Sequence, residues 1–130
     1  MERFLLICLG GAIGTGMRYL TSLAAVRWLG TDFPYGTLIV NLVGSFVIGF
    51  VQEVSVETVL VPDDARLFLT TGMMGGLTTY SAFSYETVHL MQRGAWPQAS
   101  LNVVVTTAGC LALCFLGIAV ARAVVGTRLR

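Results

Sequence analysis

The sequence predicts an all-α membrane protein with four transmembrane helices, the third of them broken near mid-membrane. Three observations indicate this fold class: an apolar composition, four apolar stretches of membrane-spanning length, and an interruption rich in glycine and threonine in the third stretch. Of the 130 residues, 55% are hydrophobic and 12% are charged, and the mean hydropathy is +0.80. Soluble domains carry about 25% charged residues, so this composition favours a protein whose surface faces lipid.

The apolar stretches form a single four-helix transmembrane domain, with approximate spans of 4–29, 33–52, 67–90 and 99–125. Each reaches the roughly 20 residues that an α-helix needs to cross the hydrocarbon core. Turn-forming and polar residues separate the stretches, at Gly30–Asp32, Val61–Asp64 and Arg93–Pro97. We therefore expect a multi-pass protein of the cell (inner) membrane with no soluble domain.

The charges are few and dispersed. The net charge is +1 and no basic run of the kind that binds nucleic acid occurs, so no nucleic-acid partner is expected. Four spans place both termini on one side of the membrane, together with the loop around Asp63. The positive-inside rule weakly favours the cytoplasm for that side, which carries Arg3, Arg66, Arg122, Arg128 and Arg130, against Arg27 and Arg93 on the other side.

No catalytic arrangement is present in the sequence, so an enzyme is not expected. His89 is the only histidine, and no acid–base pair or metal-ligand spacing occurs. Cys8, Cys110 and Cys114 lie in apolar stretches without a CxxC motif, which predicts buried thiols and neither a disulfide framework nor a metal site.

Small residues recur where helices would have to approach each other closely. Gly10 and Gly14 form a GxxxG pair, and Gly44, Ser45 and Gly49 follow one another along the second stretch. Such positions let the backbones of neighbouring helices come into contact in lipid. The glycines therefore predict tight helix packing.

Two polar residues lie at membrane depth in the first two stretches. A charge such as that of Arg18 costs about 2.5–3.5 kcal/mol on insertion scales, so it either anchors the helix at the interface or helps to attract an anion. The Asn41 amide offers two donors and one acceptor. It either bonds to another helix or replaces water around an anion.

The third stretch carries the most informative pattern. Gly75-Gly76 followed by Thr78-Thr79 makes a poor continuous helix, which predicts an unwound turn. Such a turn is tolerated within the membrane only where it is buried in protein or lines a cavity. The carbonyl groups that it frees can bind a cation, as in the broken helices of transporters.

Aromatic and hydroxyl side chains follow this turn. Tyr80 and Phe83 are three residues apart and share a helix face, and Ser81 and Ser84 form a second pair on the adjacent face. The positive edges of two aromatic rings could contact a small anion without a formal charge that would trap it. Ordinary packing of the two rings is the alternative interpretation.

The fourth stretch adds a weakly polar stripe of Asn102, Thr106 and Cys110, spaced four residues apart on one helix face. Hydroxyl and amide groups in such a stripe could replace the water around an anion. They could equally form hydrogen bonds between helices.

Taken together, these residues resemble the Fluc (CrcB-type) fluoride channels of bacteria. The resemblance covers all four stretches, and its most specific part is the motif in the third. It is carried by Gly10–Gly14 with Arg18-Tyr19, by Gly36-Thr37, Asn41 and Gly44–Phe46, and by Gly75–Glu86.

The resemblance implies a passive channel that exports fluoride and lowers its cytoplasmic concentration. It implies two chains in opposite orientations in the lipid bilayer, an antiparallel dual-topology homodimer with two pores per dimer. It also implies a structural Na⁺ at the dimer centre, held by the backbone carbonyls of Gly75 and Thr78. The fluoride pore residues would be Asn41, Tyr80, Ser81, Phe83, Ser84, Asn102 and Thr106, with Arg18 at the vestibule.

Position 80 departs from the family pattern, because it is Tyr where family members usually carry Phe. The hydroxyl could bond to fluoride, shift the ring or narrow the pore. A milder departure is Cys110, where a hydroxyl would be expected on the polar stripe.

Two other classes of protein remain as alternatives. A small multidrug-type transporter also has four helices, but it would need a membrane-buried glutamate in the first stretch, which has none after Glu2. The other alternative is a non-transporting membrane subunit held in an assembly by glycine packing.

Overall fold

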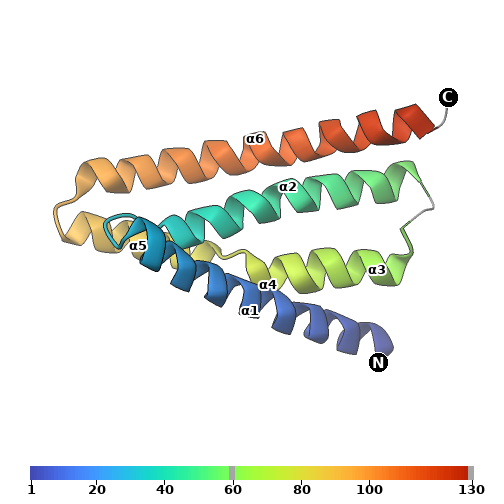
Figure 1. Cartoon of the computed structure of the whole chain (residues 1–130), viewed down its shortest axis with the longest axis horizontal. Coiled ribbons are helices and arrows are strands. Elements are labelled where there is room, and N and C mark those ends of the chain that lie inside the picture. The colour runs from blue at the N-terminus through green and yellow to red at the C-terminus, as the bar shows by residue number, and fades with distance from the viewer. Residues whose placement is uncertain (59–60, 129–130) are drawn as a thin grey trace.

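The computed structural model describes residues 1–58 and 61–128, without the side chain of Arg128, and this part of the chain is all-helical. Three long helices and one segmented unit lie along the molecule (Figure 1). The long helices are α1 (Glu2–Leu29), α2 (Tyr35–Glu57) and α6 (Trp96–Arg128). The segmented unit consists of α3 (Asp63–Leu67), η1 (Phe68–Met74), α4 (Gly75–Leu77) and α5 (Tyr80–Gln92).

The expected all-α class with an interrupted third unit is confirmed. Two of the arginines counted in the weak charge bias, Arg130 and the side chain of Arg128, lie outside the described residues.

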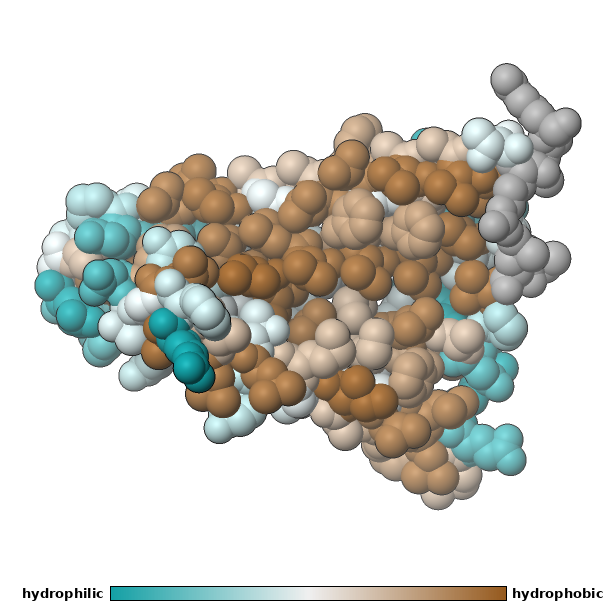
Figure 2. All heavy atoms as spheres, in the orientation of Figure 1, coloured by the Kyte–Doolittle hydropathy of each residue, from teal (hydrophilic) through white to brown (hydrophobic). Residues whose placement is uncertain are grey.

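The outer surface of the molecule is apolar. By length and composition, α1, α2 and α6 can each cross a membrane. Large apolar side chains on these helices face outward, among them Phe4, Leu20, Val104, Leu111 and Phe115. Figure 2 shows a hydrophobic band along the middle of the visible face, with hydrophilic residues gathered towards the two ends. A surface of this kind is stable in lipid and not in water, so the chain is a multi-pass membrane protein.

Helices α2 and α6 lie side by side over most of their length (Figure 1). Their backbones touch at glycines: a Cβ on Gly49 would collide with the carbonyl oxygen of Cys114, and a Cβ on Gly117 with that of Phe46. This confirms the tight packing that the small residues predict.

Helix α1 crosses the segmented unit, and glycines on both sides form the contact. A Cβ on Gly10 would lie 2.7 Å from the carbonyl oxygen of Phe68, and one on Gly72 would lie 2.9 Å from that of Ile7. Gly76 is helical and packs against Gly11. The glycines of the third stretch therefore serve helix packing. The interruption itself begins after Leu77, at Thr78.

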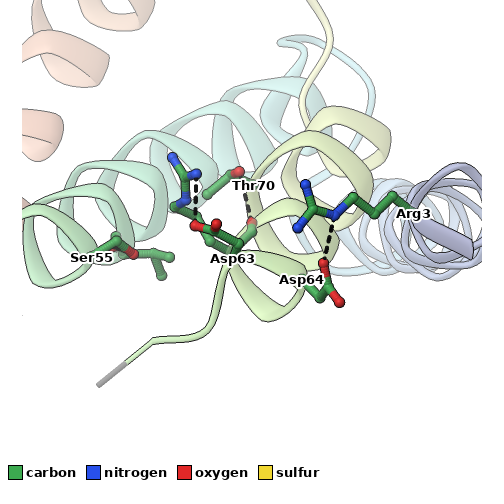
Figure 3. A network of polar contacts seen from close by, with 7 residues as sticks. Arg3, Ser55, Asp63, Asp64 and Thr70 are labelled. Atoms are coloured by element: carbon green, nitrogen blue, oxygen red, sulfur yellow. Dashed lines mark hydrogen bonds and ion pairs between the residues drawn. The ribbon is translucent and has the colours of Figure 1, made fainter. Parts of the chain in front are cut away.

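Ion pairs gather at the end of the molecule where α1 begins. Figure 3 shows Arg3 of α1 reaching Asp64 in the first turn of α3. Acidic residues in that turn also face the positive end of the helix dipole. The pairs of Arg3 and Arg66 join exposed side chains, so each adds little stability, whereas Glu53, the partner of Arg122, is only 14% exposed. The pairs are Arg3–Asp64 at 2.9 Å, Arg66–Asp63 at 3.1 Å and Arg122–Glu53 at 2.6 Å.

Candidate functional site

The third unit is interrupted at Thr78 and Thr79, whose backbones are extended (φ −79°, ψ 156° and φ −155°, ψ 117°). The N–H of Thr78 still donates to the carbonyl of Met74 at 2.9 Å, the last helical bond of the first half. The hydroxyl of Thr79 accepts from the N–H of Ala82 at 3.2 Å and caps α5. The break therefore ends one helix and starts the next within two residues.

Asn41 of α2 lies directly against this break. Its Oδ1 accepts from the N–H of Thr79 at 2.8 Å, and its Nδ2 donates to the carbonyl of Thr79 at 3.0 Å. Both residues are buried, with exposed fractions of 8% and 9%. One side-chain amide thus pairs with both polar backbone groups of an extended residue, which would otherwise be costly to bury.

A groove of about 450 Å³ runs between α2, the break and α6. No charged side chain is among the described residues that line it. Its polar groups are hydroxyls, one amide, one thiol and backbone carbonyls. The lining residues are Asn41, Gly44, Ser45, Ile48, Thr70, Met74, Gly75, Thr78, Thr79, Tyr80, Phe83, Thr106, Thr107, Cys110 and Leu111.

Two aromatic rings stand at this groove. The ring centroids of Tyr80 and Phe83 are 5.3 Å apart, with the planes tilted by 49°. Phe83 is buried at 7% exposure, while Tyr80 is 79% exposed and lies on the open side of the groove. In a single chain the second ring is thus fixed by packing and the first has few neighbours.

The groove unites six of the sequence-predicted site residues: Asn41, Gly75, Thr78, Tyr80, Phe83 and Thr106. Ser81, Ser84 and Arg18 do not line it. The hydroxyl of Ser84 donates to the carbonyl of Tyr80 at 2.9 Å, and that of Ser81 lies 3.2 Å from the Thr79 hydroxyl. Arg18 is half-buried on α1, away from the groove lining. The functional roles assigned to these three residues, and to the six that line the groove, stay predictions.

Asn102 lies behind the groove, with 1% of its surface exposed. Its Nδ2 donates to the hydroxyl of Thr87 at 2.9 Å, and its Oδ1 accepts from the hydroxyl of Thr106 at 3.3 Å. The Thr87 hydroxyl in turn donates to the carbonyl of Phe83 at 2.7 Å. This chain of hydrogen bonds connects Thr106 at the groove with the aromatic residue on α5.

A second, smaller cavity of about 230 Å³ lies at the other end of α5, near the loop between α1 and α2. Glu86 lines it and accepts through Oε1 from the hydroxyl of Thr37 at 2.7 Å. Its Oε2 is buried and has no hydrogen-bond partner among the described residues. Glu86 lies within α5, and the sequence gave no sign of its partner Thr37 on α2.

The cysteines differ in part from the prediction. Cys110 and Cys114 are half-buried. Cys8 is exposed on the outer face of α1, so the apolar surroundings of its thiol are lipid and not protein. All three are free thiols. Within residues 1–58 and 61–128 no cluster of three or more His, Cys, Asp or Glu side chains could hold a metal.

Sequence reasoning missed Thr79 and Thr87 as members of the site. A threonine immediately before the first residue of a helix, here Tyr80, is a recognisable N-cap signal, so Thr79 could have been found. Thr87 could not, since its role depends on Asn102 across a helix pair.

Comparison with known proteins adds independent information. Residues 5–118 match the family model described as "CrcB-like protein, Camphor Resistance (CrcB)". A protein of Anaeromyxobacter dehalogenans named "Fluoride-specific ion channel FluC" is 51% identical over 115 residues, covering 88% of this chain and 91% of the relative. Proteins of the same name from Geobacter sp. (strain M21) and Clostridium perfringens are 47% and 42% identical, covering 95% and 91% of this chain and 99% and 92% of the relatives.

Proposed function

Because this chain belongs to the CrcB-like protein family, we propose that it forms a passive, fluoride-selective channel that exports fluoride across the cell membrane. Relatives that match 88% or more of the chain are named as fluoride-specific ion channels. The protein is thus an ion channel and not an enzyme. Its activity would lower cytoplasmic fluoride.

The observation that carries this proposal is the uncharged polar groove beside the break. Fluoride is small and strongly hydrated, so a pore must replace its water with other donors. The groove offers hydroxyls, the remaining N–H of Asn41 and the positive edges of Tyr80 and Phe83. Since none of the described residues that line it is charged, an anion that enters is not held by an opposite charge and can leave.

The direction of fluoride transport follows from the fluoride concentration gradient and the membrane potential. Fluoride enters acidified cells as neutral HF and is trapped as the ion. A passive pore then lets it leave, because moving one negative charge out of an inside-negative cell yields about 2.3 kcal/mol per 100 mV.

We further propose that two copies assemble in opposite orientations and that each dimer holds two pores. The groove of one chain is open along one side, and Tyr80 and Gly75 are exposed there. Lipid could not line an ion path, since it offers no hydrogen bonds. A second copy over the groove would close it with protein.

The break also fits a structural Na⁺. The N–H of Thr79 bonds to Asn41 and not to Gly75, which leaves the Gly75 carbonyl without its helical partner. Among the described residues, the carbonyl of Thr78 accepts no hydrogen bond either. Oxygen ligands at a helix C-terminus suit a small cation. When bound, Na⁺ would supply positive charge at the dimer centre, with Gly75 and Thr78 of each chain as its ligands.

A liposome efflux assay tests the function. Reconstituted protein should release fluoride, read with a fluoride electrode, while chloride-loaded liposomes at the same protein-to-lipid ratio release almost none. Equal release of the two anions would contradict selectivity. Absence of fluoride release, with the dimer intact on a sizing column, would leave the non-transporting subunit as the better interpretation.

Dual topology is tested by replacing Cys8, Cys110 and Cys114, introducing a single cysteine and labelling it from each side of the membrane. Labelling from both sides in similar amounts is expected. Strictly one-sided labelling would exclude antiparallel assembly. A small multidrug-type transporter is disfavoured because the only acidic residue of α1 is Glu2, an exposed residue in its first turn.

A further inference from the structure

The hydrogen bonds of Thr79 show how the break is kept open. In a continuous helix the N–H of Thr79 would donate to the carbonyl of Gly75, four residues earlier. Here that N–H donates instead to Oδ1 of Asn41 at 2.8 Å. The side chain of α2 has taken the place of one helical bond.

The second bond of Asn41 completes the arrangement. Its Nδ2 donates to the carbonyl of Thr79 at 3.0 Å, so acceptor and donor of one amide meet donor and acceptor of one backbone residue. A planar amide can make this pair of bonds only with a residue in extended conformation, and Thr79 is extended (φ −155°). The burial of both residues keeps water from replacing either bond.

Three features of the break depend on this pair of bonds: two backbone carbonyls and the direction of α5. The carbonyl of Gly75 is left without its helical donor. The carbonyl of Thr78 lies between the two half-helices. The axis of α5 starts from Thr79, which caps it, so the direction of α5 sets where Tyr80 and Phe83 stand.

We propose that Asn41 is a positioning residue: its amide holds the break open, which keeps the carbonyls of Gly75 and Thr78 available and aims the two aromatic rings into the groove. The part of this role that concerns fluoride conduction rests on the proposed function. The structural part, that Asn41 protects the Thr79 amide, stands independently. Asn41 retains one N–H with no acceptor among the described residues, so it can also face an anion.

Hydrogen exchange of the Thr79 amide tests the structural part. In the wild-type protein this N–H should exchange slowly, because it is buried and bonded. In Asn41→Leu, which keeps the bulk and removes both bonds, exchange at Thr79 should be about tenfold faster or more. Val43→Leu is the matched control, since Val43 lies on the exposed face of the same helix. Unchanged exchange in Asn41→Leu would overturn the proposal.

A backbone change separates positioning from direct contact with the ion. Replacing the Thr79 amide by an ester removes the N–H that donates to Oδ1 of Asn41 and leaves every side chain in place. If Asn41 acts through the break, this ester lowers fluoride efflux about tenfold, as Asn41→Leu does. If the ester leaves efflux unchanged while Asn41→Leu abolishes it, Asn41 acts only on the ion and the positioning role is wrong.

The ester also makes the carbonyl oxygen of Thr78 a weaker acceptor and ligand. The ester and Asn41→Leu are therefore combined in a double-mutant cycle. The ester should cause no further loss in the Asn41→Leu background, because the shared bond is already gone. Losses that multiply would contradict the proposal. Should Asn41→Leu not fold, Asn41→Ser, which is too short to bridge both atoms, takes its place in both experiments. If the wild-type protein conducts no fluoride, the proposed function fails, while the exchange comparison still decides the structural role.

Discussion

The contact between α1 and the π-helical segment η1 gives the sharpest prediction about stability. A Cβ added at Gly10 would lie 2.7 Å from the carbonyl oxygen of Phe68 and 3.0 Å from the backbone nitrogen of Met73. Contacts under 3.0 Å to a Cβ are essentially never observed, and ordinary contact begins near 3.4 Å. Both groups belong to helix backbones, so α1 and η1 would have to separate by about 0.3–0.7 Å to accept Gly10→Ala.

The matched control is Gly16→Ala on the same helix, where a Cβ would meet nothing within 4 Å. Both substitutions replace a helical glycine by alanine, so the gain in helix propensity, up to about 1 kcal/mol, is common to the two. The difference between the variants therefore isolates the overpacking cost, which is about 1–3 kcal/mol.

Thermal unfolding in detergent, followed by tryptophan fluorescence, measures this difference. Gly10→Ala should melt several degrees below Gly16→Ala, since a change of 1 kcal/mol moves Tm by roughly 2–8 °C in domains of comparable size. Gly10→Ala should also lower fluoride efflux, because η1 leads directly into α4 and the break. Equal melting temperatures for the two variants would refute the argument that backbone contact at Gly10 positions the broken unit.

Three further predictions concern the groove. Asn102→Ala removes the buried partner of two threonine hydroxyls and should destabilise the fold by about 1–3 kcal/mol in thermal melting, whereas Ser100→Ala on the exposed face should not. Phe83→Ile removes a ring edge and should lower fluoride efflux while the dimer survives on a sizing column; unchanged efflux would remove Phe83 from the pore. Tyr80→Phe keeps the ring and should retain efflux within a few-fold, so a loss greater than tenfold would show that the hydroxyl is required.

The class of fold was predictable because it depends on composition. A chain with 12% charged residues and four long apolar stretches has few arrangements open to it other than helices in lipid. The interruption was also predictable, since glycine and threonine both disfavour a continuous helix.

The cause of the interruption could not be predicted from the sequence. Gly75 and Gly76 are helical, and Gly76 allows close packing against α1, while the extended residues are Thr78 and Thr79. The deciding interaction comes from Asn41, 38 residues earlier in the chain. Local propensity cannot report a partner on another helix. The π-helical segment η1 likewise packs against a distant part of the chain, the glycines of α1.

The polar stripe on α6 shows a second limit of prediction from sequence. A spacing of four residues places side chains on roughly one face, but each step turns by about 40° more than a full circle. Over eight residues this rotation moves Asn102 towards α5, while Thr106 and Cys110 line the groove. The sequence therefore identified the polar face but could not divide it between groove and interior.

The two ends of the helical bundle have a consequence for how the protein can be tagged and fused. Helix α1 begins and α6 ends at the same end of the molecule (Figure 1). Reporters attached before α1 and after α6 of one chain would therefore lie on the same side of the membrane. In the proposed antiparallel pair, a reporter on one terminus would be divided equally between the two sides. A single-chain version of the dimer would need a linker that itself crosses the bilayer, and an ordinary flexible loop would force the two halves into parallel orientation.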